Sequence, residues 1–101
     1  MVLAGGIVER GAGQPALVSA YVVLNEGSKS RLFKVRGSAD APAVTELDSA
    51  TTVDLARFRR ELADDLDPAL ASIRAAGGSP SIAVPKPEWV TGVVDRYLKG
   101  A

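Results

Sequence analysis

A cluster of acidic side chains in the second half of the chain is the first candidate for chemistry; it comprises Glu61, Asp64, Asp65 and Asp67. Neighbouring carboxylates can bind Mg²⁺ or Ca²⁺, or act as a pair in general acid–base catalysis. The segment lacks the central glycine of a Ca²⁺-binding loop. Arg57 precedes Glu61 by four residues, and Arg60 precedes Asp64 by four, which is the spacing of ion pairs on a helix surface. We therefore expect a solvated helix face that binds no metal.

A basic stretch in the first half contains Lys29, Arg31, Lys34 and Arg36. Cations around an aromatic residue, here Phe33, are found in sheets that bind nucleic acid by stacking and neutralisation. On a strand, however, Phe33 and Lys34 point to opposite faces. We expect Phe33 in the core and the cations in water, where they hinder strand-to-strand aggregation. The formal net charge of zero, from 12 basic and 12 acidic residues, also argues against a nucleic-acid partner.

Two residue types that carry much of enzyme chemistry are missing, because the sequence has neither cysteine nor histidine. Disulfides, thiolate metal sites and Ser-His-Asp triads are thereby excluded. A Gly-Ala-Gly segment, Gly11–Gly13, follows a predicted strand, but Pro15 and an apolar run come next instead of the helix that a nucleotide-binding loop requires. The segment therefore indicates a hairpin turn. We expect no cofactor, no metal and no catalytic residues, and thus a protein that is not an enzyme.

The length of 101 residues, with 47% apolar and 24% charged side chains, predicts a single globular domain over residues 1–101. The longest uncharged run, Gly11–Asn25, contains glycine and proline and is shorter than the roughly 20 apolar residues of a transmembrane helix. The N-terminal segment Met1–Glu9 lacks the basic residues of a secretory signal. We predict a cytoplasmic protein that has no membrane partner.

The first half of the chain has the pattern of strands joined by turns. Ala16–Leu24 is uncharged and rich in β-branched residues, which favours a strand. Arg31–Arg36 alternates apolar and charged residues, as a half-buried antiparallel strand does. Between them, Asn-Glu-Gly-Ser at residues 25–28 indicates a tight turn. Leu3–Glu9 and Ala43–Leu47 are two further predicted strands.

The second half begins with a helical pattern, since apolar residues recur every three or four positions over Leu55–Ile73. Pro68 interrupts this stripe. A proline inside a helix removes a hydrogen bond and clashes with the preceding turn, yet it is well tolerated as the first residue of a new helix. The sequence therefore predicts either one helix kinked at Pro68 or two helices, over about Thr52–Leu66 and Pro68–Ala76, that share one apolar face.

The ends of this helical region have recognisable capping residues. Thr51 or Thr52 is a suitable N-cap, and Asp54 then places a carboxylate in the first turn, where the helix dipole favours negative charge. Two glycines at residues 77–78 predict the C-terminal end, because glycine readily adopts the left-handed conformation found there.

The last segment of the chain contains the strongest candidate for an interaction surface. Ser81–Val84 predicts a short strand, and Pro87 can begin a final helix. The apolar stripe of that helix is wider than a single core-facing seam requires, and it holds the only tryptophan of the chain. Tryptophan and tyrosine are enriched at interfaces, so we expect part of the stripe to contact a partner. The candidate interface residues are Trp89, Val90, Val93, Val94, Tyr97 and Leu98.

These elements predict an α+β fold: a small antiparallel sheet of three to five strands, mostly from the N-terminal half, packed by a kinked or split helix and a C-terminal amphipathic helix. In so short a chain we do not expect the helices to cover both faces of the Ala16–Leu24 strand. The resulting hypothesis is a small non-enzymatic interaction or assembly module that binds itself, as a homodimer, or another protein. Two alternatives remain: a small-molecule-binding regulatory domain with a pocket between the sheet and the last helix, and a subunit of a phage or tail-type assembly.

Overall fold

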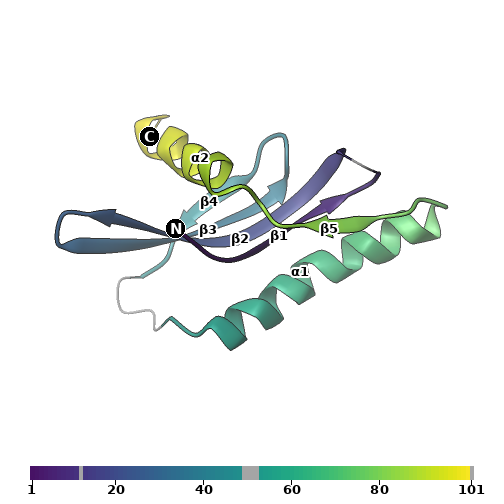
Figure 1. Ribbon diagram of the computed structural model, residues 1–101, viewed down its shortest axis with the longest axis horizontal. Helices are drawn as coiled ribbons and strands as arrows, with labels where there is room; N and C mark the ends of the chain where they lie inside the picture. Colours follow the sequence, from purple (N-terminus) through teal and green to yellow (C-terminus); the bar gives the residue numbers. More distant parts are fainter. Residues whose placement is uncertain (12, 49–52, 101) are drawn as a thin grey trace.

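A computed structural model describes residues 1–11, 13–48 and 53–100 of the chain. Their fold is α+β, as the sequence predicts, with an antiparallel sheet and two helices (Figure 1). The predicted segments agree with the observed ones to within a few residues. The elements are β1 (Val2–Glu9), β2 (Pro15–Glu26), β3 (Lys29–Ser38), β4 (Ala43–Glu46), α1 (Leu55–Ala75), β5 (Ser81–Ala83) and α2 (Pro87–Gly100).

The sheet has the strand order β4-β3-β2-β1-β5, and every neighbouring pair is antiparallel. Its first four strands follow one another in sequence as a meander. The turn between β2 and β3 needs only two residues, and Gly27 provides the positive φ of 62° that so tight a turn requires. After α1, β5 joins the opposite edge and pairs with β1 only at Ile7–Glu9. The two edges of the sheet are therefore β4 and the β1–β5 pair.

The two helices cover opposite faces of the sheet, with α2 above it and α1 below it in Figure 1. Side chains on a strand alternate between faces, so the central strand β2 contributes to both layers. Val18, Ala20 and Val22 pack with Val90, Val93 and Val94 of α2. On the other face, Tyr21 packs with Phe58 and Leu62 of α1.

One expectation about coverage was wrong, because a single chain does cover both faces of the Ala16–Leu24 strand. Val18, Ser19, Ala20 and Val22 are completely buried, and Tyr21 is nearly so. The strand is central in the sheet, and each face has its own helix. The middle of this strand is therefore core, and only its ends are partly exposed.

Helix α1 runs without a break through Pro68, so of the two predicted alternatives the structure has one helix and not two. Pro68 lies on the exposed side, while Leu66 and Leu70 are buried against the sheet on either side of it. Burial of both leucines favours helix on both sides of Pro68 despite the missing backbone donor. Of the predicted stripe, Leu55 is the exception, with 40% of its surface exposed.

The N-terminal cap of α1 also differs from the prediction. The side chain of Asp54 accepts a hydrogen bond from the backbone N–H of Arg57 at 3.1 Å, so Asp54 is the N-cap instead of a first-turn residue. Thr51 and Thr52, the predicted caps, lie outside the described residues. At the other end, Gly77 has a φ of 88° and the N–H of Gly78 donates to the carbonyl of Ile73, which confirms the predicted glycine stop.

Two glycines of β1 allow close packing on both faces of the sheet. A Cβ atom on Gly5 would lie 2.9 Å from the Cβ of Ala20 and 3.2 Å from Cγ of Pro85. On the other face, a Cβ on Gly6 would lie 2.8 Å from Cδ1 of Leu66 in α1. Side chains at these positions would force Ala20 or Pro85 to shift on one face and the side chain of Leu66 to shift on the other. No helix of the described residues is long and apolar enough to cross a membrane.

Candidate functional site: a polar cluster under α1 and a hollow beside α2

Asp65 brings the acidic and basic segments of the sequence together between α1 and the sheet. Its Oδ2 accepts a hydrogen bond from the hydroxyl of Ser19 at 2.9 Å and lies 3.1 Å from Nζ of Lys34. Its Oδ1 lies 3.2 Å from a terminal nitrogen of Arg36. Ser19 is completely buried, and only 11% of the Asp65 side chain is exposed. The helix carboxylate therefore neutralises two cations of β3, the largely covered Lys34 and the exposed Arg36.

Tyr21 is the second centre of this polar cluster. Its hydroxyl donates a hydrogen bond to Glu61, whose other oxygen lies 3.0 Å from Nε of Arg57. The ring of Tyr21 stacks on Phe58, with centroids 4.0 Å apart and planes 7° apart. Nζ of Lys34 lies 5.0 Å from the centre of the same ring, within range of a cation–π interaction. Tyr21 thus has both apolar and polar contacts with α1.

These contacts shift the acid–base equilibria of the cluster. Burial and the hydrogen bond to Glu61 raise the pKa of Tyr21. Burial alone would lower the pKa of Lys34, but its interactions with Asp65 and Tyr21 outweigh burial and raise it. Burial alone would raise the pKa of Asp65, but its interactions with Lys34, Ser19 and Arg36 outweigh burial and lower it. The hydrogen bonds from Tyr21 and Arg57 lower the pKa of Glu61. At neutral pH both carboxylates and Lys34 are therefore charged.

Chemically, this cluster fastens α1 to the sheet. No buried side-chain nitrogen or oxygen in the described part of the chain lacks a hydrogen-bond partner, so the cluster offers no free base. Within the same residues, no group of three or more carboxylates is placed to hold a metal ion. The carboxylates of Glu61 and Asp65 have their charge compensated by protein cations, as a structural ion-pair network requires.

The four residues of the predicted acidic cluster lie in two different environments. Asp64 and Asp67 are exposed as expected, but Glu61 and Asp65 turn towards the sheet. Lys34 was expected in water and instead lies under α1, largely covered. Strand alternation contained a signal for this placement. Ser19 and Tyr21 lie two residues apart and so point to the same face of β2, and Lys34 is the partner of Tyr21 on β3.

One prediction for the basic stretch and one for the acidic cluster hold, and the expected placement of the basic side chains is modified. Phe33 is completely buried on the α2 side of the sheet, as predicted from the alternation of its strand. The predicted helix pair Arg57–Glu61 forms. Arg31 of the basic stretch donates two hydrogen bonds to the carboxylate of Glu46 in β4, from Nε at 2.9 Å and from a terminal nitrogen at 2.7 Å. This contact joins β3 to β4 at that edge of the sheet.

The predicted interface residues of α2 have three different environments. Val90, Val93 and Val94 are buried against β2 and β3. Trp89 and Leu98 are half-buried and pack at the margin of this core. Tyr97 points away from it and keeps 42% of its surface exposed.

Tyr97 lies at a hollow between the end of α2 and the β4 edge of the sheet. The hollow has a volume of about 530 Å³. Its walls are mostly alanine, proline and valine, with Asp40 and Arg96 as the charged members. Asp40 belongs to the turn before β4, and neither charged side chain forms an ion pair among the described residues. The lining residues are Asp40, Ala41, Pro42, Ala43, Val44, Val93, Arg96 and Tyr97.

Comparisons of the chain with protein-family models, with curated proteins and with solved structures found no match.

Proposed function

We propose that this chain is a non-enzymatic protein-interaction module that forms a homodimer through the outer side of α2 and the adjoining β4 edge. The observation that carries the proposal is the exposed Tyr97 beside a largely apolar hollow at a sheet edge. Aromatic residues next to apolar pockets are typical contact residues of protein interfaces. Val90 and Val94 of α2 support this surface from the core, and Val93, although mostly buried, also lines the hollow.

The charges of the hollow favour a second copy of the chain as the partner. In a two-fold contact the same patch meets itself, so a residue on one side faces a different residue of the same patch on the other. Asp40 and Arg96 carry opposite charges and lie on the two sides of the hollow, one in the turn before β4 and one on α2. A two-fold axis through the hollow would bring Asp40 of each copy to Arg96 of the other. The patch is therefore self-complementary.

Sedimentation of the wild-type chain and a set of charge variants tests this proposal. The wild type should sediment above monomer mass at tens of micromolar. Tyr97→Glu should sediment as a monomer while keeping its circular dichroism, because it places two carboxylates in a desolvated contact. Ala71→Glu, at an exposed position of α1, is the matched control and should leave the mass unchanged.

A charge-reversal pair identifies the contact itself. Asp40→Arg and Arg96→Asp should each weaken the dimer, since each leaves like charges opposed, and the double variant should restore it. A wild type that remains monomeric at millimolar concentration would overturn the proposal. So would a dimer that Tyr97→Glu and both charge variants leave intact.

Small-molecule binding in the same hollow is a second candidate function. Its volume, its largely apolar walls and its few polar groups fall within the usual description of a ligand site. A thermal-shift screen of small organic molecules tests this alternative. A ligand that binds there should raise the melting temperature of the wild type, and Tyr97→Glu should abolish the rise.

A further inference from the structure

The opposite edge of the sheet, at β1, has an unpaired stretch of backbone. Strand β5 is short and pairs only with Ile7–Glu9, so Val2–Gly6 has a neighbouring strand on the β2 side alone in the described ladders. After β5 the chain leaves the edge: Pro85 lies close to Gly5 on the face that α2 covers. Val2–Gly6 is thus a strand edge that can accept one more strand.

A groove of about 440 Å³ lies along this unpaired stretch. Arg59 and Leu62 of α1 form its wall on one face of the sheet, and the link between β5 and α2 forms the other wall. Val84 in that link is 85% exposed, which is far more than a valine in a folded protein usually shows. An added strand would therefore meet side chains on both of its faces as well as backbone at its edge.

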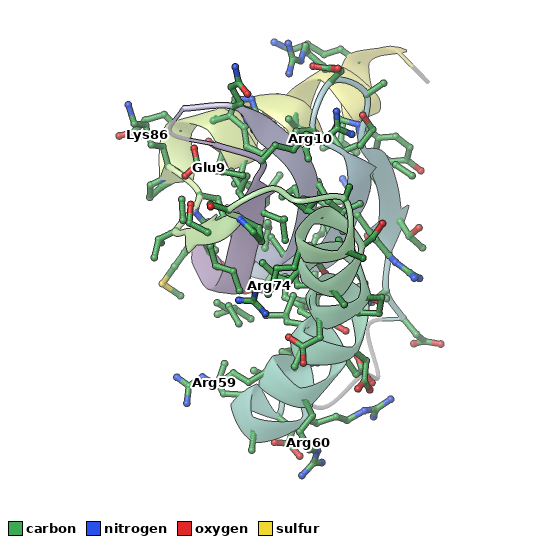
Figure 2. All side chains as sticks on the ribbon, turned by 90° about the vertical axis from the view of Figure 1, so that its right-hand side faces the viewer. Glu9, Arg10, Arg59, Arg60, Arg74 and Lys86 are labelled. Carbon is green, nitrogen blue, oxygen red and sulfur yellow. The ribbon has the colours of Figure 1, made fainter. Side chains whose placement is uncertain are left out.

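Charge indicates what kind of strand fits. Arg59 is the one charged residue of the groove wall, and Lys86 lies in the link between the two prolines that line the groove, Pro85 and Pro87. Both cations are exposed and without an ion pair in the described part of the chain. Figure 2 shows both on its left side, Lys86 above and Arg59 below.

A second copy of the chain is a poor occupant for this groove. Two-fold pairing of the β1 edges would place Arg59 of both copies at the same contact, with no acidic residue in the groove lining to neutralise them, and like charges across an interface oppose association. This edge differs in that respect from the α2 hollow, which contains both signs of charge. The two surfaces also lie at opposite edges of the sheet, so this inference does not depend on the proposed homodimer.

We propose that Val2–Gly6 pairs with an extended segment of another protein in which apolar and acidic side chains alternate. Backbone hydrogen bonds to β1 would hold the segment, as in other cases of strand addition. Because successive side chains of a strand point to opposite faces, the acidic ones would face Arg59 and the apolar ones would cover the exposed Val84.

The test uses a displayed library of ten-residue peptides, sorted for binding to the whole chain. Apolar residues occupy every second position, and the other positions are randomised over Asp, Glu, Lys, Arg, Ser and Thr. Sorting should enrich Asp and Glu at the randomised positions. Arg59→Glu should weaken binding of the enriched peptides by roughly tenfold or more, the size of one charge-assisted contact. Arg60→Glu, the neighbouring exposed arginine outside the groove, is the matched control and should change affinity by less than about twofold.

Two further measurements locate the peptide. Bound peptide should slow hydrogen exchange of backbone amides within Val2–Gly6 and leave those of the already paired β2–β3 hairpin unchanged. Peptides with Lys in place of Glu should bind Arg59→Glu better than they bind the wild type. The proposal fails if no acidic peptide is enriched, if Arg59→Glu and Arg60→Glu weaken binding equally, or if Val84→Asp converts a dimer of the wild type to a monomer, because the edge would then be occupied by a second copy.

Discussion

Nζ of Lys34 lies 3.1 Å from Oδ2 of Asp65, and this ion pair joins the third strand to the longer of the two helices described. Both side chains are mostly withdrawn from water. Taking two charges out of water is unfavourable, so such a pair adds little net stability by comparison with apolar packing, but removal of one partner leaves a buried charge uncompensated. These properties lead to a first prediction.

Asp65→Ala should lower the free energy of unfolding by about 3 kcal/mol, because Lys34 and Ser19 lose their partner inside the contact. Urea denaturation measures this difference. Asp64→Ala is the matched control, since Asp64 is an exposed carboxylate on the same helix, and it should change the free energy of unfolding by less than about 0.5 kcal/mol. Equal effects of the two variants would show that Asp65 is solvated.

Stability should depend on pH at both ends of the scale. The pKa values of Asp65 and Glu61 are lowered in the folded state, so their contribution is present above the unfolded value, about 4, and is lost as pH falls through the folded values. The pKa values of Tyr21 and Lys34 are raised, so their contribution is present below about pH 10 and is lost as pH rises through the folded values. Urea denaturation over a pH series should show both losses. Asp65→Ala should flatten the acidic one, and an unchanged acidic limb in that variant would contradict the assignment.

Leu62→Ala should lower the free energy of unfolding by about 2–5 kcal/mol, through lost burial and the cavity left behind. Leu62 packs with Phe58 and Tyr21 in the contact between α1 and the sheet. Leu55→Ala, one helix turn before Phe58 and 40% exposed, is the comparison and should have an effect below about 0.5 kcal/mol. A loss below that value for Leu62→Ala would mean that the helix presents a different side to the sheet.

Two glycine-to-alanine changes should have opposite signs. Gly5→Ala forces a Cβ to within 2.9 Å of Ala20 in the centre of the sheet and should lower the free energy of unfolding by about 1–3 kcal/mol. Gly92→Ala meets no atom within 4 Å on a helix, so it should raise the free energy of unfolding by up to about 1 kcal/mol. Thermal denaturation followed by circular dichroism separates the two outcomes. A stabilising Gly5→Ala would mean that β1 and β2 pack less closely than described.

Divalent cations should leave the protein unaffected. Protein cations already neutralise Glu61 and Asp65, so titration with Mg²⁺ or Ca²⁺ should keep the melting temperature within about one degree. A saturable rise of several degrees that Asp64→Ala or Asp65→Ala abolishes would instead establish a metal site.

Sequence periodicity alone determined the strands and helices of this protein, because hydrophobic alternation and helical spacing are local properties. The apolar face of α1 could be derived in this way, including Phe58, Leu62 and Leu70. The absence of cysteine and histidine also excluded disulfides, thiolate metal sites and Ser-His-Asp triads from the sequence alone. The sequence predicted Tyr97 and Val90 together as interface residues, and nothing local distinguished the exposed tyrosine from the buried valine.

Tertiary structure decided how these elements combine. The hydrogen bond between Ser19 and Asp65 joins residues 46 positions apart, and it exists because α1 occupies one face of β2 while α2 occupies the other. Continuity of α1 through Pro68 likewise depends on the sheet, since the buried leucines on either side outweigh the local preference of proline. The sheet edges at β4 and β1 are defined only by strand order. Strand order and helix placement depend on contacts between distant residues, which no local pattern encodes.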